Sequence, residues 1–459
     1  MGRVWGWGGI GWRRGHRSET LPHLVLADAD KVHDYVFGTQ ELKLIRGASE
    51  LQRWLAEVHL RSLCDEEVIF AGGGRVLAEF SSLAEAQAFR WQAERAFVEH
   101  AVTGTITTET AAYKPGEFAQ CMEAVQEKLE RRKTEGRLGG SKPGNWFFAG
   151  CEACGREPAA QVVDDRGTER RLGAACIGRA LRNREVEQRE GPRAADFEAI
   201  ARGSRPENYL AAVYCDMDRL GRWLAKVKNK EDYKRLSEAI DCGVKRAVRE
   251  TLAEIGGRRA DLGYEILLMG GDDAVVVMRP QLIFAFVEGF YQRLATIPNR
   301  PACSMGILIA HHHYPIAKFV EGAEQLLRNA KKEREGDAVD YAVLNESMTV
   351  TAVMGRKAGA DKVFRTAKPY DITTIGFPGL AGKLMRLKEG VSSSRLKEIG
   401  RLVYRPREEA LMEYAFLLLR SPEAERRVLL NEIGMDLWNM RNGKESTEVG
   451  DLLELWRVV

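Results

Sequence analysis

The sequence predicts an α+β protein that contains two ferredoxin-like βαββ units, a small cysteine-containing insert between them and a helical C-terminal domain. Two observations predict this architecture. A strand, a helix and a glycine-broken hairpin occur in that order twice, within residues 21–140 (the first unit) and 205–350 (the second unit), as in ferredoxin-like folds. After residue 350, apolar residues recur at helical spacing, so residues 351–459 are expected to form helices.

Length and composition define the broad class. The chain has 459 residues, enough for about three domains. Its 44% hydrophobic and 29% charged residues are typical of a globular protein, and a net charge of +3 does not by itself indicate nucleic-acid binding. No apolar run reaches the roughly 18 residues that cross a bilayer. Residues 1–20 lack the apolar core of a signal peptide, and the eight cysteines are thinly spread. We therefore expect a flexible N-terminal tail at 1–20, no membrane partner and a cytoplasmic protein.

The first unit opens with an apolar strand that ends in two alternating acids, Asp28 and Asp30. A helix-like stretch follows, and the later apolar run of residues 68–77 is interrupted by Gly72, Gly73 and Gly74. Short apolar runs broken by a tight glycine turn are typical of β-hairpins.

The second unit repeats this order and places acids at the hairpin. The apolar run Ala211–Cys215 leads into Asp216 and Asp218, and a long amphipathic stretch follows. The later run of residues 266–277 is interrupted by Gly270-Gly271-Asp272-Asp273. Asp216, Asp272 and Asp273 are therefore expected to lie together on adjacent strands.

Three carboxylates on adjacent strands indicate a site for hard divalent cations. Mg²⁺ and Mn²⁺ prefer oxygen ligands. Nucleotidyl transfer uses such ions to activate a 3′-hydroxyl and to neutralise charge on a triphosphate. Asp216, Asp272 and Asp273 are thus the candidate catalytic and metal-binding residues. The alternative is a solvated Gly-Asp turn without a metal.

Two neighbouring features suit a triphosphate. Gly270 and Gly271 allow the chain to turn tightly and a phosphate to approach the backbone. The loop from Met217 to Gly221 leads into a helix, whose first N–H groups are expected to receive the triphosphate.

The insert, at residues 141–204, carries a zinc-knuckle pattern. Cys151 and Cys154 are spaced as in such knuckles, and Cys176 follows at a suitable distance. A structural zinc site needs four ligands, but Arg179 stands where a fourth cysteine is expected. Either Cys121 completes the site, or the thiols remain reduced and bind no metal.

Three segments resemble the catalytic palm of the large subunit of type III CRISPR effector complexes. They are Asp216–Gly221, Gly270–Asp273, and Ser304–His312 followed by Ala330 and Lys331. Asp28–Val32 and Leu44–Ser49 are similar to the first, non-catalytic palm of that family. The resemblance covers most of residues 21–459 in the family's domain order. It identifies the first unit as the non-catalytic palm and the second as the catalytic palm.

The resemblance implies that the protein converts ATP into cyclic oligoadenylates when target RNA binds to a complex of CRISPR RNA and protein subunits. Asp272 and Asp273 would hold Mg²⁺ or Mn²⁺ beside Asp216, Ser304 would lie near the base, and Lys331 near the triphosphate. The residues expected to bind nucleotide are Asp218, Gly221, Gly270, Gly271, Ser304 and Lys331 in the second unit, and Asp28, Gly72 and Gly73 in the first. Lys331 is suited to a polyphosphate as a compact positive charge, unless it is only a solvated helical lysine.

The first unit lacks the acids of the catalytic hairpin. Gly74 stands where Asp272 stands in the second unit, and Arg75 stands where Asp273 stands. Neither residue ligates Mg²⁺, whereas an arginine pairs with phosphate. We expect this unit to bind an acceptor nucleotide, the alternative being a purely structural platform.

The sequence departs from the family in one large feature. The large subunit usually begins with an HD-type nuclease domain, but the only His-Asp dipeptide, His33-Asp34, falls inside the first unit. We expect a short form of the subunit that lacks this domain and does not cleave DNA.

Two rival functions remain open. The chain could be a stand-alone synthase with a different product, either a cyclic dinucleotide or an AMP adduct, because one sequence does not show the shape of the nucleotide pocket. The chain could instead be an idle scaffold of a CRISPR ribonucleoprotein, although a scaffold has no need of three metal ligands. A diguanylate cyclase fits less well, because that family has a single palm and a different hairpin tetrad.

Overall fold

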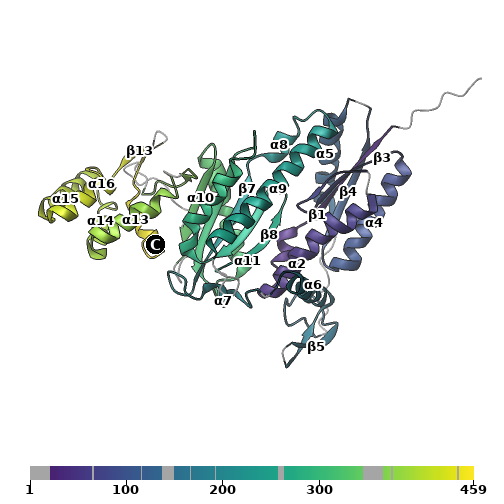
Figure 1. Ribbon diagram of the computed structural model, residues 1–459, viewed down its shortest axis with the longest axis horizontal. Helices are drawn as coiled ribbons and strands as arrows, with labels where there is room; N and C mark the ends of the chain where they lie inside the picture. Colours follow the sequence, from purple (N-terminus) through teal and green to yellow (C-terminus); the bar gives the residue numbers. More distant parts are fainter. Residues whose placement is uncertain are drawn as a thin grey trace, which may run out of the picture.

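The computed structural model describes residues 21–64, 67–114, 116–136, 149–165, 167–191, 193–256, 263–344, 365–373, 376–441 and 444–458. The expected tail and the expected domain boundaries at 140/141 and 350/351 lie outside these residues. In Figure 1 the first unit lies at one end, the second unit in the middle and the C-terminal helices at the other end. The predicted α+β class is confirmed.

The first unit contains a four-stranded sheet in the order β2-β3-β1-β4. Its strands are β1 (His23–Asp30), β2 (Val68–Gly72), β3 (Arg75–Phe80) and β4 (Thr105–Ala112). β1 pairs antiparallel with β3 and β4, which places Asp28 opposite Arg75 on one side and Thr107 on the other. The acid at the end of β1 is thus flanked by a residue from each neighbouring strand.

Helices cover both faces of this sheet. They are α1 (Val32–Val36), α2 (Leu42–Trp54), the π-helix η1 (Leu55–Leu60), α3 (Arg61–Cys64), α4 (Leu83–Ala101) and α5 (Phe118–Gly136). Because side chains alternate along a strand, Leu24 and Leu26 pack with α5, whereas Val25 and Ala27 pack with α2 and α4. The same alternation places Asp28 on the α5 side.

The second unit contains a six-stranded sheet in the order β12-β11-β10-β7-β9-β8. Its strands are β7 (Tyr209–Met217), β8 (Tyr264–Gly270), β9 (Asp273–Met278), β10 (Cys303–His311), β11 (Ala338–Val343) and β12 (Tyr370–Asp371). Its helices are α8 (Leu220–Leu224), α9 (Lys230–Ile255), η4 (Pro280–Leu282), α10 (Ile283–Leu294) and α11 (Ile316–Glu333). β12 lies in the part expected to be helical, so the second sheet draws a strand from beyond residue 350.

The two sheets share a topology. The order β8-β9-β7-β10 repeats β2-β3-β1-β4. α10 connects β9 to β10 as α4 connects β3 to β4, and α11 follows β10 as α5 follows β4. The internal duplication inferred from the sequence therefore extends to the helices.

The insert packs beside the first unit. It contains the hairpin β5 (Gln161–Asp165) and β6 (Thr168–Leu172), then α6 (Ala174–Glu190) and α7 (Phe197–Ala201). Figure 1 shows α6 beside α2, and these two helices are in extensive contact.

A buried ion pair ties the insert and both units together. Arg46 of α2 donates to Glu265 of β8 at 2.6 Å and to Asn183 of α6 at 3.1 Å. Arg46 is 5% exposed and Glu265 is 2% exposed. Removing one partner of such a pair typically costs roughly 3–5 kcal/mol, so the start of the strand that leads to the acidic hairpin is firmly anchored.

The C-terminal part is mainly helical, as predicted. Its helices are α13 (Gly379–Gly390), α14 (Ser393–Leu402), α15 (Arg407–Arg420), α16 (Glu423–Glu432) and α17 (Val449–Leu455). A short hairpin, β13 (Asn439–Arg441) and β14 (Lys444–Ser446), was not expected from the helical periodicity. None of the described helices has the length and apolar character that a membrane span requires.

Alternation along β7 creates two apolar cores. Ala211, Val213 and Cys215 pack with α9, α10 and, through a continuous core, with the C-terminal helices. Ala212 and Tyr214 face the other side, where the core joins α11 to α2 and α4 of the first unit. The two units therefore share the second of these cores, and the side chains at even positions of β7 point toward it.

Candidate active site

The alternation of β7 also sets the direction of the predicted acids. Asp216 occupies an even position, on the face of Tyr214, which packs against α11 and the first unit. Asp218 follows in the turn directly after the strand. Asp273 is in phase with Val275 of β9, which belongs to the same core. Ser304 of β10 lies opposite Asp216 in the register. Three strands thus present polar residues to one face at the same end of the sheet.

The hairpin between β8 and β9 brings the remaining acid to this face. Gly270 pairs with Asp273, so Gly271 and Asp272 form the turn. Gly271 has a backbone φ of +65°, which residues other than glycine rarely adopt. Carboxylate oxygens of Asp216, Asp272 and Asp273 all lie within 4.8 Å of one another. The structure therefore brings together the three acids predicted from the sequence.

Burial makes these acids difficult to ionise together. It raises the pKa of Asp273 to about 8, and the neighbouring Asp272 adds to the effect. It also raises the pKa of Asp272, which Arg75 of the first unit partly offsets. A divalent cation between the carboxylates would relieve this repulsion. The donor set and its electrostatics fit Mg²⁺ or Mn²⁺.

Lys331 and Ser304 also lie at the site, each bound to an acid. Lys331 Nζ contacts Asp216 Oδ2 and lies 3.5 Å from Asp218 Oδ1. The fully buried Ser304 donates to Asp218 Oδ2 at 3.1 Å. Burial raises the pKa of Asp218 to about 6, although the hydrogen bond from Ser304 acts to lower it. Lys331 is thus not the freely solvated lysine of the alternative interpretation.

The loop before Gly221 leads into a helix, as predicted. This helix, α8, contains Gly221 and spans only 5 residues, and the long helix α9 starts later, at Lys230. A helix of one turn has few aligned peptide dipoles to offer a triphosphate. Binding of a triphosphate at its N-terminus remains a prediction.

The glycine turns of the two units pack against each other. A Cβ added to Gly73 would lie 3.0 Å from Gly271 N, and one added to Gly270 would lie 2.8 Å from Gly73 Cα. A Cβ on Gly72 would lie 3.1 Å from Asp241 Oδ1. Close approach of two backbones therefore explains these glycines without a phosphate. Phosphate binding at Gly72 and Gly73 remains a prediction.

The first unit repeats the polar pattern of the second with different partners. Asp28 accepts from Arg75 at 3.1 Å and from Lys133 at 2.7 Å. Thr107 donates to Asp30 at 2.9 Å, as Ser304 donates to Asp218. Lys133 lies 3.5 Å from Asp30, as Lys331 lies 3.5 Å from Asp218. Arg75 and Lys133 neutralise Asp28, which leaves no cluster of free carboxylates there.

Thr107 and Lys133 were missed in the sequence. They occupy the positions of Ser304 and Lys331 in the repeat, but no motif surrounds them. Only a strand-by-strand alignment of the two units, extended past the hairpin to β4 and α5, would have identified them.

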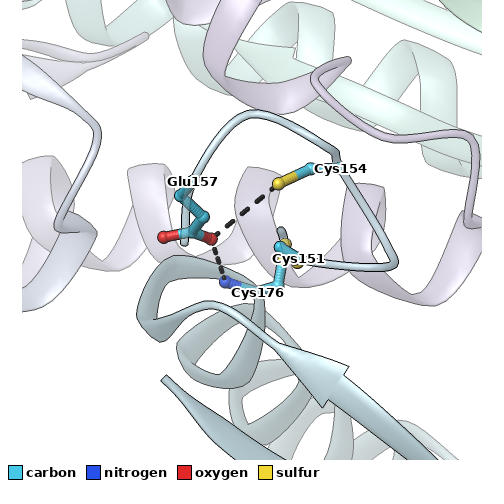
Figure 2. Close-up of side chains that lie close together, drawn as sticks. All are labelled: Cys151, Cys154, Glu157 and Cys176. Carbon is cyan, nitrogen blue, oxygen red and sulfur yellow. Dashed lines mark hydrogen bonds between the residues drawn. The ribbon is translucent and has the colours of Figure 1, made fainter. Parts of the chain in front are cut away.

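The insert contains a second candidate metal centre. The sulfur atoms of Cys151, Cys154 and Cys176 and a carboxylate oxygen of Glu157 lie within 4.8 Å of one another. Figure 2 shows these groups turned toward a common point, with Glu157 hydrogen-bonded to the sulfur of Cys154 and the backbone nitrogen of Cys176. Glu157 also accepts from Ala175 N at 3.3 Å. Its carboxylate is therefore held in place beside the three thiols.

Burial and the closeness of the thiols to one another shift their pKa values. Burial raises the pKa of Cys176, and the nearby Cys154 and Cys151 raise it further. Burial also acts on Cys151, but hydrogen bonds from backbone N–H groups, that of Gly173 foremost, lower its pKa overall. Zinc binds thiolate and carboxylate ligands in tetrahedral sites, so this quartet fits Zn²⁺.

Neither Cys121, which was considered as the fourth ligand, nor Arg179, which stands where a fourth cysteine was expected, joins the quartet. Cys121 lies on α5 and is buried against the first sheet, where its thiol donates to Ala111 O of β4. Arg179 lies over the ring of Tyr35, 4.3 Å from its centroid. Glu157 was missed because carboxylates are common surface residues and its spacing from Cys154 matches no cysteine pattern.

Comparison with known proteins supports the sequence resemblance. Residues 209–340, which include the three acids, match a family model described as Cas10/Cmr2, second palm domain. No curated protein sequence matches the chain.

Solved structures extend the likeness over nearly the whole chain. A Csm1–Csm4 cassette in complex with cA3 matches with a TM-score of 0.59 and 15% identity, over 96% of this chain and 70% of that chain. The cassette in complex with one ATP matches with a TM-score of 0.59 and 17% identity, over the same shares. The Csm1–Csm4 subcomplex of the type III-A CRISPR-Csm interference complex matches with 0.58 and 16% identity, again over 96% and 70%. The resemblance to the large subunit of type III CRISPR complexes is confirmed, and the chain shares the fold of these structures.

Proposed function

We propose that this chain is a metal-dependent nucleotidyltransferase that converts ATP into cyclic oligoadenylates as the large subunit of a type III CRISPR complex. The observation that carries the proposal is the convergence of Asp216, Asp272 and Asp273 within 4.8 Å at one end of a palm sheet. The matched structures support it, because their descriptions name ATP and cA3 as bound molecules.

Asp216, Asp272 and Asp273 would hold Mg²⁺ or Mn²⁺. When bound, the ions would activate the attacking 3′-hydroxyl and neutralise charge on the triphosphate. The chain supplies the geometry, since the acids come from two strands and a tight turn that are fixed by the sheet. Little side-chain movement is then needed to form the site.

Lys331 would assist by exchanging partners. Without nucleotide its ammonium pairs with Asp216 and lies near Asp218. A triphosphate and cations at the acids would leave Lys331 free to pair with phosphate oxygens. Ser304, being fully buried, would act by holding Asp218 through its hydroxyl rather than by reaching the base.

The first unit would bind the acceptor nucleotide. Arg75 and Lys133 offer two positive charges beside Asp28. The charge of Asp28 raises the pKa of the Arg75 guanidinium, which stays charged. Arg75 is also close enough to Asp272 for that acid to stabilise its charge. A nucleotide held there would face the donor site, and such positioning is a major source of rate enhancement. The alternative is a unit that serves only as a platform.

The insert would bind one structural Zn²⁺ through Cys151, Cys154, Cys176 and Glu157. The support is the quartet of ligand atoms within 4.8 Å. The ion would fold the loop that carries the first two cysteines onto the start of α6. The insert also contacts the first unit, where Thr39 donates to Ala153 O at 3.0 Å.

The partners proposed are ATP, a Csm4-like subunit and, through the complex, CRISPR RNA and target RNA. A cytoplasmic location follows from that assembly as part of the proposal. A cyclic dinucleotide or an AMP adduct remains the alternative product, and an idle scaffold the alternative role.

The proposal is tested by incubating the purified chain with labelled ATP and Mn²⁺, beside the double variant Asp272→Asn, Asp273→Asn. The amides keep the shape of the turn but lose the charge that holds the metal. We expect oligoadenylate products from the wild type and none from the variant. Equal product from both would rule out this site, and a product of two joined nucleotides would select the cyclic dinucleotide alternative.

A further inference from the structure

We propose that Asp241 is a positioning residue for the catalytic turn, and that Lys245 and Glu57 make its action depend on the first unit. This inference rests on the proposed function but concerns residues other than those assigned to the metal site or to the nucleotide. Asp241 and Lys245 belong to α9 of the second unit, and Glu57 belongs to the π-helix η1 of the first unit.

Asp241 holds the turn directly. Its Oδ1 accepts the backbone N–H of Gly271 at 2.8 Å. Asp241 is 7% exposed, so this charge-assisted hydrogen bond lies in a poorly solvated place. Gly271 immediately precedes the two acids of the hairpin. An anchor on its N–H therefore constrains where both carboxylates point.

The other oxygen of Asp241 leads to the first unit. Lys245 Nζ donates to Asp241 Oδ2 at 2.8 Å and to Glu57 Oε1 at 2.6 Å. Both lysine contacts are largely buried, with Lys245 15% and Glu57 18% exposed at the side chain. Arg53 of α2 adds a further ion pair, at 3.5 Å from Glu57. A line of ion pairs thus runs from the first unit to the backbone of the catalytic turn.

The glycine turns meet at the same place. A Cβ on Gly72 would lie 3.1 Å from Asp241 Oδ1, and one on Gly73 would lie 3.0 Å from Gly271 N. Asp241 therefore borders the hairpin of the first unit as well as the catalytic hairpin. A change in the packing of the first unit, for instance when a nucleotide binds there, would act on the catalytic acids through this contact.

Such a link would fix the orientation of the acids that are proposed to hold the metal. Metal affinity depends on residues that orient the ligands, and removing one of them typically costs about 10- to 100-fold. A merely structural role predicts a loss of stability without a specific effect on the turn. The two roles are therefore separable by measurements on the protein without nucleotide.

The test compares four variants of the full chain. Asp241→Leu removes both interactions of the acid. Asp241→Asn keeps an oxygen for Gly271 N–H but removes the charge that pairs with Lys245. Glu57→Gln weakens only the connection to the first unit. Glu448→Gln is the matched control, because Lys383 donates to Glu448 at 2.6 Å with similar burial in the C-terminal part.

Three readouts are taken: Mn²⁺ affinity, hydrogen exchange of the segment 264–278, and the thermal midpoint. We expect Asp241→Leu to weaken Mn²⁺ binding by about 10-fold or more and to speed exchange at the turn. Asp241→Asn and Glu57→Gln should give smaller changes of the same sign. Glu448→Gln should leave Mn²⁺ affinity and turn exchange unchanged.

Wild-type Mn²⁺ affinity and exchange in Asp241→Leu would overturn the proposal. So would losses that only follow the thermal midpoint, as in the control. Unchanged readouts in Glu57→Gln alone would remove the link to the first unit. If the wild type binds Mn²⁺ but makes no product, the proposed function fails while these comparisons still decide the role of Asp241.

Discussion

The two units have the same topology but use the acid at the end of their first strand differently. Asp28 is enclosed by Arg75 and Lys133, whereas Asp216 faces Asp272 and Asp273 and has Lys331 as its cationic partner. The lysine is common to both units, and so is a hydroxyl on the next strand. The difference therefore reduces to the hairpin, which supplies an arginine in one unit and two acids in the other.

This comparison shows that the two hairpins differ at two positions. Under the proposed function, Arg75 would pair with phosphate in the first unit, and the two acids would hold a metal in the second. The order of the four shared strands and the helix that carries the lysine are retained. We therefore expect the two positions after the glycine turn to decide the chemistry of each unit.

The largest effect should come from removing the acid of the first strand in each unit, Asp216 or Asp28, one at a time. Asp216→Ala should reduce product formation on the order of 100-fold or more, the scale expected for one group that stabilises developing charge. Asp28→Ala, at the equivalent position, should leave Mn²⁺ affinity unchanged. The measurements are initial rate with labelled ATP and Mn²⁺ titration. Equal losses of Mn²⁺ affinity in the two variants would contradict the division of labour.

The two lysines allow the nucleotide sites to be separated. Lys133→Met and Lys331→Met should each weaken ATP binding at one site by roughly 10- to 100-fold, as expected for a lost hydrogen bond from a charged group. Wild type should bind two ATP and each variant one at moderate concentration. Calorimetry with a non-hydrolysable analogue measures the stoichiometry. One analogue molecule bound to the wild type would make the first unit a platform. Two bound to Lys133→Met with unchanged affinity would exclude Lys133 from the nucleotide site of that unit.

Zinc removal tests what joins the insert to the units. The reduced protein should contain one zinc, and a strong chelator should lower its thermal midpoint because the ion crosslinks the insert. Glu157→Gln should lower zinc affinity by about 10-fold or more, if the carboxylate is a ligand. Metal analysis and competition with a chromophoric chelator measure both. Zinc retained with wild-type affinity in Glu157→Gln would exclude Glu157 as the fourth ligand.

The smallest effect concerns the contact between the glycine turns. Gly73→Ala and Gly203→Ala both place a Cβ at positive φ, +60° and +75° respectively, but only Gly73 has a backbone in the way. Each should lose about 1 kcal/mol of unfolding free energy for the conformation. Gly73→Ala should lose a further 1–3 kcal/mol or so from overpacking. Denaturant unfolding measures both, and equal losses would show that the turns can separate without cost.

Much of the candidate active site could be predicted from the sequence, because its motifs consist of residues that are neighbours in the chain. The apolar run before Asp216 and the Gly270–Asp273 tetrad predicted two strands, a tight turn and three converging acids, all of which the structure contains. Alternation within a strand has a period of two, so the apolar neighbours of an acid already indicate the face to which it points.

The histidine run illustrates the limit of that argument. Strand alternation predicts that His311–His313 point to opposite faces, but β10 ends at His311 and the next two residues lie in a turn. Ring nitrogens of the three therefore lie within 4.8 Å of one another. Nδ1 of His311 accepts the backbone N–H of His313 at 3.3 Å. The three rings are therefore not spread over two faces, because the strand does not continue past His311.

Contacts between segments that are distant in the chain could not be predicted from the sequence. Glu157 joins three cysteines because β6 and α6 fold back over its loop, and nothing in its own surroundings marks it as a ligand. Lys133 lies about a hundred residues from Asp28 in the chain, and Asp241 meets Gly271 only where a helix crosses a hairpin. The sequence determined the acids, the turn and the repeat, since these depend on neighbours in the chain. The tertiary structure decided which cation faces which acid, because ion pairs and metal ligands are set by distances that only the packed fold defines.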